Sequence, residues 1–264
     1  MTDEREHRTA TCEPVSVFNK NGESPYLLVC EHASNFIPET FKGLGLEGDA
    51  LQAHIAWDPG AVEVARHLAS SLHAPLVESQ LSRLLIDCNR PLDAHDLIPE
   101  ISETTVVPGN HALNSMERLA RIDLSHRPFH TAVEHVIAER ARRGQASWIV
   151  TIHSFTPIYR DVPRPWPIGI IHDEDDRIGK PLIAALRKDP ALNVGVNEPY
   201  SPADRVYYTL ERHARPRNAP CVMIELRNNE IADGPAQIAW AEKLATILRD
   251  IAKAIDPRNT EQKA

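Results

Sequence analysis

The sequence predicts an α/β protein, a three-layer α/β/α sandwich whose central sheet is mixed but mostly parallel. Two observations carry this prediction. Short apolar runs that suit buried strands, such as residues 26–30 and 147–153, alternate with loops and with amphipathic segments that suit helices. The chain then closes with an amphipathic helix at 235–254, whose apolar side chains recur at helical spacing.

Length and composition predict a single domain. A chain of 264 residues, 42% of them hydrophobic, can bury a large core, and α/β proteins of this size commonly form one domain. We expect residues 13–255 to form it. The polar segments 1–12 and 256–264 have the composition of flexible tails.

The net charge and the cysteine pattern indicate which kinds of partner and which cellular compartment to expect. A formal net charge of −8 argues against nucleic acid as the main partner. No apolar run approaches a membrane span, and the charged first eight residues lack the apolar core of a signal peptide. None of the four cysteines forms a CxxC pair, which suits a reducing cytoplasm. The expected protein is cytoplasmic, without a membrane or nucleic-acid partner, and its oligomeric state is left open.

The individual elements follow from two periodicities, short apolar runs for strands and apolar positions three and four apart for helices. In chain order they are strands at 15–18 and 26–30, a helix at 61–73, strands at 75–78 and 84–88, a helical stretch at 115–143 broken at Pro128, strands at 147–153 and 168–172, a helix at 178–188, strands at 193–197 and 221–229, and the closing helix. The irregular segments 92–112 and 157–167 are expected to form the rim or wall of a site.

Three strong strands end in side chains that carry chemistry. The run 26–30 leads to His32, the run 147–153 ends in His153, and the run from residue 221 contains Glu225. Open α/β sheets bind ligands at the carboxyl ends of their strands, so we expect these side chains to meet there. A single histidine in such a place commonly hydrogen-bonds a loop, but the repetition favours a shared site.

Two carboxylates have two readings each. Asp58 stands just before Pro59 and helix 61–73, where it is either an ordinary N-cap or a metal ligand held by the turn. Glu225 interrupts an apolar run, and a buried, unpaired carboxylate is costly. Glu225 is therefore expected to face a metal, an arginine or a water-filled pocket, the alternative being a salt bridge to Arg227 or Arg90.

The predicted strand 84–88 releases Asn89 and Arg90 at its end. The planar guanidinium of an arginine suits a substrate carboxylate, because it gives two parallel charge-assisted bonds. Arg83, before the same strand, is expected to be structural. Of the histidines in the helical stretch, His126 and His135 are expected to be structural and His130 to support the site from behind.

The absence of several well-known motifs argues against some classes of reaction. There is no GxGxxG fingerprint, no GxxxxGK phosphate loop and no GxSxG elbow, so nicotinamide, ATP and acyl-serine chemistries lose their usual support. Two histidines and one carboxylate, here His32, His153 and Asp58, are the usual ligands of a catalytic zinc. Zinc would lower the pKa of a bound water to ~7. Glu225 could then move its proton to a leaving amine.

Four segments, in order, resemble the N-formylglutamate amidohydrolase family. They are Cys30-Glu-His-Ala-Ser-Asn-Phe-Ile-Pro38, Ser82-Arg-Leu-Leu-Ile-Asp-Cys-Asn-Arg-Pro91, Ile152-His-Ser-Phe-Thr-Pro157 and Ile224-Glu-Leu-Arg-Asn228. The family is related in fold to zinc carboxypeptidases and aspartoacylase-like enzymes. The resemblance implies a zinc-dependent hydrolase of histidine catabolism that cleaves N-formyl-L-glutamate to formate and glutamate.

The same resemblance implies roles for single residues. It suggests His32 and His153 as ligands of one zinc ion and Glu225 as general base. It also suggests that Asn89 and Arg90, assisted by Ser154 and Arg227, bind a small anionic N-acyl amino acid. Zinc carboxypeptidases take their carboxylate ligand three residues after the first histidine, where this sequence has Asn35. Asp58 is therefore the expected third ligand. Glu31 is a poorer choice, because neighbours along a strand point to opposite faces.

Two alternatives stay open. The first is another zinc carboxypeptidase-like amidohydrolase that acts on a different N-acyl amino acid or a short peptide. The second is a binding protein that has kept the pocket without the metal.

Overall fold

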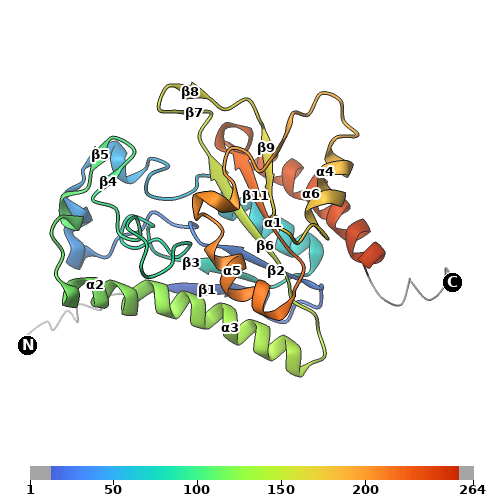
Figure 1. Cartoon of the computed structure of the whole chain (residues 1–264), viewed down its shortest axis with the longest axis horizontal. Helices are drawn as coiled ribbons and strands as arrows, with labels where there is room; N and C mark the ends of the chain where they lie inside the picture. Colours follow the sequence, from blue (N-terminus) through green and yellow to red (C-terminus); the bar gives the residue numbers. More distant parts are fainter. Residues whose placement is uncertain (1–12, 256–264) are drawn as a thin grey trace, which may run out of the picture.

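The computed structural model describes residues 13–255 (Figure 1). The two predicted tails, 1–12 and 256–264, lie outside the described residues. The described part is a three-layer α/β/α sandwich around one mixed seven-stranded sheet, which confirms the predicted fold class. Within residues 13–255, no helix is long and apolar enough to cross a membrane.

The central strands of the sheet lie parallel to one another, so their carboxyl ends share one edge. Antiparallel steps occur only toward the margins, where β1 pairs with β3 and β9 with β11. In spatial order the strands are β1 (Val15–Phe18), β3 (Leu76–Ser79), β2 (Tyr26–Cys30), β6 (Trp148–Phe155), β11 (Cys221–Arg227), β9 (Ile168–Ile171) and β10 (Val194–Val196).

Helices bury both faces of this sheet. One face packs against α1 (Ala61–Leu72), α4 (Gly179–Leu186) and α6 (Gly234–Ile255), and the other against α3 (Arg127–Arg142) and α5 (Tyr208–His213) (Figure 1). Alternate side chains of β2 therefore enter two different cores, and all five are buried. Burial on both faces explains why this strand is a continuous apolar run.

Shorter elements surround the sheet. Two small hairpins, β4 (Ile101–Ser102) with β5 (Thr105–Val106) and β7 (Ile158–Tyr159) with β8 (Val162–Pro163), project beyond the carboxyl edge of the parallel strands (Figure 1). The remaining elements are α2 (Ser115–Arg121), a π turn at Ile122–His126, and 3₁₀ turns at Glu39–Gly45, Gly48–Leu51, Pro108–Asn110, Pro202–Asp204, Arg215–Arg217 and Asn228–Glu230.

The strand predicted at 84–88 is wrong. The chain turns there: the amide of Leu85 donates to the carbonyl of Ser82 at 3.0 Å, and that of Asp87 donates to Leu97 at 2.8 Å. The apolar side chains at 84–86 are buried in two small clusters beside the sheet. A short apolar run shows that a segment is buried but does not distinguish a strand from a buried turn.

Two predicted boundaries also shift. The strand that begins at Trp148 does not end at His153 but continues to Phe155, because β11 pairs with it that far. The helical stretch departs from α geometry at the π turn rather than at Pro128. Pro128 is the second residue of α3, directly after this wider turn, where a missing N–H is tolerated.

Candidate active site

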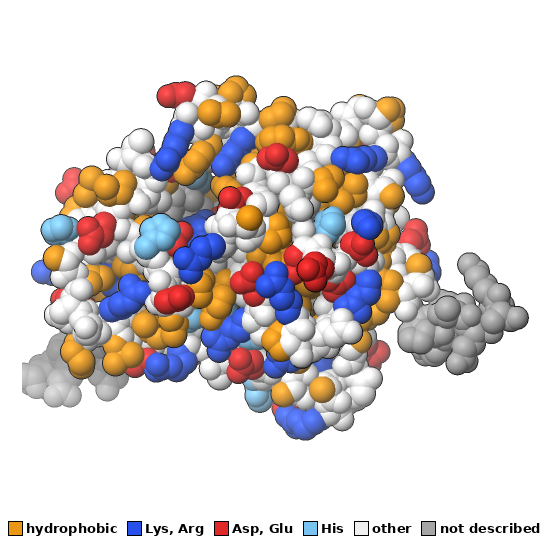
Figure 2. Space-filling view, viewed as in Figure 1, with side chains coloured by type: hydrophobic (Ala, Val, Ile, Leu, Met, Phe, Trp, Pro, Cys, Tyr) orange, Lys and Arg blue, Asp and Glu red, His pale blue; other side chains and the backbone are white. Residues whose placement is uncertain are grey.

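A cavity of about 430 Å³ opens at the carboxyl edge of the parallel strands. The face of the molecule seen in Figure 2 carries acidic, basic and histidine side chains side by side. The side chains that line the cavity come from the ends of the strands, from the loop before α1, from the turn at 83–90 and from both small hairpins. They include His32, Asp58, Arg83, Asp87, Asn89, Arg90, His153, Ser154 and Glu225.

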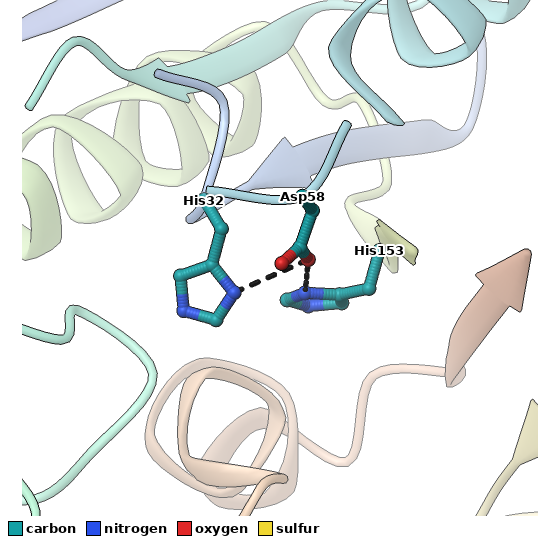
Figure 3. A group of neighbouring side chains, drawn as sticks. All are labelled: His32, Asp58 and His153. Carbon is teal, nitrogen blue, oxygen red and sulfur yellow. Dashed lines mark hydrogen bonds and ion pairs between the residues drawn. The ribbon is translucent and has the colours of Figure 1, made fainter. Parts of the chain in front are cut away.

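Buried strands deliver His32 and His153. His32 follows β2 by two residues, and His153 lies within β6, the neighbouring parallel strand. Each residue is only 2% exposed. Their ring centroids lie 5.0 Å apart, so the two histidines from distant parts of the sequence share one site (Figure 3).

Asp58 lies between these two imidazoles. Its Oδ2 atom is 3.2 Å from Nδ1 of His32 and 2.9 Å from Nδ1 of His153 (Figure 3). Gly60, in a left-handed conformation with φ of 79°, takes the N-cap position of α1. The side chain of Asp58 is thereby left for the site, and the amide of Ser154 donates to it at 3.3 Å. Of the two readings open from the sequence, the geometry favours the ligand.

The donor atoms of His32, Asp58 and His153 all lie within 4.8 Å of one another, so a single cation could take all three. The contacts of the second nitrogen, Nε2, of each ring are also those expected of a metal-bound histidine. Nε2 of His32 is 2.7 Å from Asp87, and Nε2 of His153 is 3.2 Å from Glu31. Metal-ligating histidines typically give their second nitrogen to a carboxylate, which orients the ring and leaves the other nitrogen for the metal. The residues present therefore fit a divalent cation of the zinc type.

The electrostatics of the site agree with this fit. Burial opposes a charge on His153, but Glu31 and Asp58 outweigh it and raise its pKa well above the usual range. Burial and Arg83 oppose a charge on His32, yet Asp87 and Asp58 raise its pKa. Despite its burial, Asp58 has a lowered pKa because both imidazoles favour the carboxylate. A site that attracts positive charge so strongly suits a cation as well as protons.

Glu225 lines the same cavity from β11. It stands beside His153 in the parallel register of β11 and β6 and is 4% exposed. Burial raises its pKa to about 7; the charge on Asp58 adds to this effect and that on His153 opposes it. Among the described residues, the Oε2 atom of Glu225 has no hydrogen-bond partner. A buried carboxyl group with a pKa near neutrality can take up and release a proton under ordinary conditions.

Three charged groups of the site were missed or undervalued from the sequence. Asp87 and Glu31 hold the two histidine rings, and Arg83, expected to be only structural, lines the cavity. The guanidinium of Arg83 lies 2.7 Å from Asp87 and 3.4 Å from Asp58, so it fixes both carboxylates. The only signal in the sequence was the position of Glu31 and Asp87 at the ends of apolar runs.

The predicted substrate-binding residues Asn89 and Arg90 both line the cavity. The side chain of Asn89 donates to the carbonyl of Val206 and accepts from the amide of Thr209. Arg90 pairs through Nε with Asp96 at 2.8 Å, and its Nη1 donates to the carbonyl of Asn89. Within residues 13–255, no hydrogen-bond partner is found for Nη2 of Arg90.

Ser154 and Arg227 contribute differently. Ser154 lines the cavity, but its hydroxyl donates to the carbonyl of Pro59 at 2.9 Å, so it ties β6 to the start of α1. Arg227 is not among the residues that line the cavity. Its guanidinium pairs with Glu230 at 2.6 Å and donates to the carbonyl of Arg164 at 3.0 Å. The structure thus places Ser154 at the cavity, whereas Arg227 does not line it.

Buried histidines support the backbone at 88–90 from behind. His126 and His130 place their Nε2 atoms 2.9 Å from the carbonyls of Arg90 and Cys88. Since a carbonyl only accepts, Nε2 of His130 carries the proton. Its Nδ1 then accepts from Nε2 of His213 at 2.9 Å. This arrangement needs a neutral His130, and burial lowers the pKa of both His130 and His213, which favours the neutral form of each.

Comparisons with known proteins identify the family of the chain. A model of the family described as N-formylglutamate amidohydrolase matches residues 24–232. Gene product Atu2144 from Agrobacterium tumefaciens is 43% identical, with a TM-score of 0.90 over 92% of this chain and 96% of that one. N-formylglutamate amidohydrolase from Ralstonia eutropha JMP134, 19% identical, has a TM-score of 0.58 over 92% of this chain and 98% of that one, and shares the fold. No curated protein matches the sequence. The family match covers most of the chain, so the chain belongs to the N-formylglutamate amidohydrolase family.

Proposed function

We propose that this protein is a zinc-dependent amidohydrolase that cleaves N-formyl-L-glutamate to formate and L-glutamate. One observation carries the proposal. Asp58 lies between the Nδ1 atoms of two histidines, and the other nitrogen of each ring lies 2.7 Å (His32) or 3.2 Å (His153) from a further carboxylate. Such a donor set serves a cation better than it serves substrate directly. The family match supplies the reaction class.

The residues of the site have different roles in the reaction. His32, Asp58 and His153 would hold the cation, which would supply Lewis-acid activation of the water and of the formyl carbonyl. Glu225 takes a proton from the attacking water and passes it to the amide nitrogen as the carbon–nitrogen bond breaks. The nitrogen receives this proton and the one released by the newly formed formic acid, so formate and the ammonium form of glutamate leave and atoms and protons balance. Glu225 is placed for both transfers, because it lines the cavity and its Oε2 atom has no hydrogen-bond partner among the described residues.

Arg90 orients the substrate. Its Nε is held by Asp96, which fixes the plane of the guanidinium at the cavity wall. The Nη2 group then offers a charge-assisted hydrogen bond to one carboxylate of the N-formyl amino acid. This contact would place the formyl group near Glu225 and the two histidines, because all four residues line the same cavity.

The test combines metal content with product release. Protein purified without added metal is analysed for bound ions and assayed for formate release from N-formyl-L-glutamate and a panel of other N-acyl amino acids, with and without chelator. We expect one divalent ion per chain, formate release that the chelator abolishes, and recovery on adding zinc. Metal-loaded protein that releases no formate would overturn the reaction. Full turnover after measured removal of the ion would overturn the role of zinc.

A further inference from the structure

Two arginines of the hairpin formed by β7 and β8 stack on one tyrosine. The Cζ atom of Arg160 lies 5.3 Å from the ring centroid of Tyr159, and that of Arg164 lies 4.4 Å from it. Arg164 also lies over the rings of Tyr200 at 4.8 Å and Phe155 at 5.7 Å. The cluster thus concentrates two positive charges on a small aromatic surface.

Neither guanidinium has an acidic partner. Among residues 13–255, no carboxylate oxygen lies within 4.0 Å of Arg160 or Arg164. The other two arginines that line the cavity are paired, Arg83 with Asp58 and Asp87, and Arg90 with Asp96. The chain has 37 acidic against 29 basic residues, so the missing partners do not reflect a shortage of carboxylates.

Arg164 is largely buried and has no carboxylate partner among the described residues. The residue is only 8% exposed. Its charge is stabilised by contact with three aromatic faces, which leaves it free of any carboxylate in the described residues. The backbone of Arg164 is nevertheless held firmly, because its amide donates to Pro157 at 2.8 Å and its carbonyl accepts from Arg227 at 3.0 Å. Such a rigid, unpaired cation is suited to an anion supplied from outside the chain.

Part of the cluster lines the active-site cavity. Tyr159, Arg160 and Tyr200 line the cavity. Asp96 and Glu103 also line it, but each is paired, with Arg90 and His54 respectively. Arg160 is thus a cation of the cavity wall without a carboxylate partner among residues 13–255, so it attracts an anionic group in the cavity. A substrate with two carboxylates needs two cationic contacts, and Arg90 provides only one.

We propose that Arg160, supported by Arg164 through Tyr159, binds the side-chain carboxylate of an N-acylated acidic amino acid and thereby sets the preference for acidic over neutral side chains. This inference rests on the proposed function and extends it. Arg160 makes the direct contact from the cavity wall. Arg164 positions the tyrosine ring and adds positive potential. The subsite discriminates because a neutral side chain leaves the stacked guanidinium groups without a counter-ion.

The test compares N-formyl-L-glutamate with N-formyl-L-glutamine, which has the same shape without the charge. In Arg160→Gln, we expect the ratio of kcat/KM for the two substrates to fall about 30-fold, through KM for the glutamate compound, the scale of one charge-assisted hydrogen bond. Arg249→Gln is the matched control, because it removes one exposed charge on α6, away from the cavity. An equal loss for both substrates would assign Arg160 to the α-carboxylate and overturn the proposal, as would an unchanged ratio.

A second pair of variants and a binding assay keep this test independent of turnover. Arg164→Lys retains the buried charge and is expected to keep most of the preference, whereas Arg164→Gln is expected to lose it. Calorimetry on metal-loaded protein is expected to show L-glutamate binding more tightly than L-glutamine in the wild type but not in Arg160→Gln. Equal binding in the wild type would overturn the subsite even if formate is released. A clear preference without formate release would retain the subsite and overturn the reaction instead.

Discussion

The floor of the cavity and its rim are built in opposite ways. The floor, formed by His32, Asp58, His153 and Glu225, is at most 4% exposed, and each of its two imidazoles contacts two carboxylates. The rim, formed by the two small hairpins, exposes apolar side chains by more than half, as at Ile101 and Ile158, and leaves charges such as Arg160 unpaired. The contrast indicates that the packed core fixes the chemistry, while the rim can change substrate preference without disturbing it.

The largest expected effect comes from breaking the floor at Asp58. Replacement of Asp58 by Asn keeps the size of the side chain but removes the charge that both imidazoles face. We expect cation affinity to fall by more than the ~10–100-fold that is typical for losing an outer partner of a metal ligand, and formate release to fall with it. Metal analysis and the formate assay measure both.

The matched control for Asp58→Asn is Asp176→Asn, which removes an exposed carboxylate paired with Lys180. It should leave metal content and turnover unchanged. Normal metal content in Asp58→Asn would show that the floor does not hold the ion through this residue.

A substitution at Glu225 distinguishes proton transfer from metal binding on the cavity floor. Replacement by Gln keeps its shape but removes its basicity, so we expect kcat to fall by about 10²–10⁴-fold while the ion stays bound. The same residue sets the pH dependence. Because burial raises the pKa of Glu225 to about 7, the basic form is lost as the pH falls through that value, and a nearby cation would move this limb lower. Near-normal turnover in Glu225→Gln would remove it from the mechanism.

The carboxylates behind the imidazoles give a smaller effect. In Glu31→Gln, the ring of His153 keeps a neighbour of similar shape but loses its charge. We expect cation affinity to fall ~10–100-fold, with kcat of the fully loaded protein retained, as is typical for outer partners of metal ligands. Competition with a chelating dye measures the affinity. If Glu31→Gln instead lost kcat at saturating zinc, Glu31 would act in the reaction itself.

The smallest effect concerns the buried histidines under residues 88–90. Burial lowers the pKa of His213 to about 3, well below the ~6.5 of an unfolded chain. As the pH falls below ~6.5, His213 takes up a proton in the unfolded state but not in the folded state. The titration of His213 therefore leaves the free energy of unfolding unchanged above pH ~6.5 and decreases it below that value. Melting temperatures at pH 7.5 and 5.0 test this, and His213→Gln should show the shallower decline. Equal slopes would mean that His213 is not buried as a neutral group.

The sequence could predict the position of the site because apolar runs mark the strands, and the polar residues at the ends of these runs mark the edge of the sheet. His32 and His153 each follow or close such a run, and the structure brings them together with Asp58. The partners across strands could not be found in this way. Glu31 and His32 follow the end of β2 in a turn, so strand alternation does not separate them, and the carboxylate of Glu31 reaches His153 on the neighbouring strand β6. That contact depends on strand register, which a single sequence does not specify.

The turn at 83–90 shows a second limit. Its apolar residues are indeed buried, but in small clusters beside the sheet, so the predicted strand is absent while Asp87 still reaches His32. Burial can be read from composition, whereas the path of the chain through a buried turn depends on long-range hydrogen bonds such as that from Asp87 to Leu97. The missing partner of Arg164 is likewise visible only once the chain is folded.

The most direct test of the whole account is the location of the ion itself. A crystal of the protein grown or soaked with zinc should show one anomalous scattering peak on the cavity floor. The account predicts bonds of about 2.0–2.2 Å to Nδ1 of His32, Nδ1 of His153 and a carboxylate oxygen of Asp58. A peak bound through the Nε2 atoms, or no ion on the floor while zinc-dependent formate release persists, would contradict it.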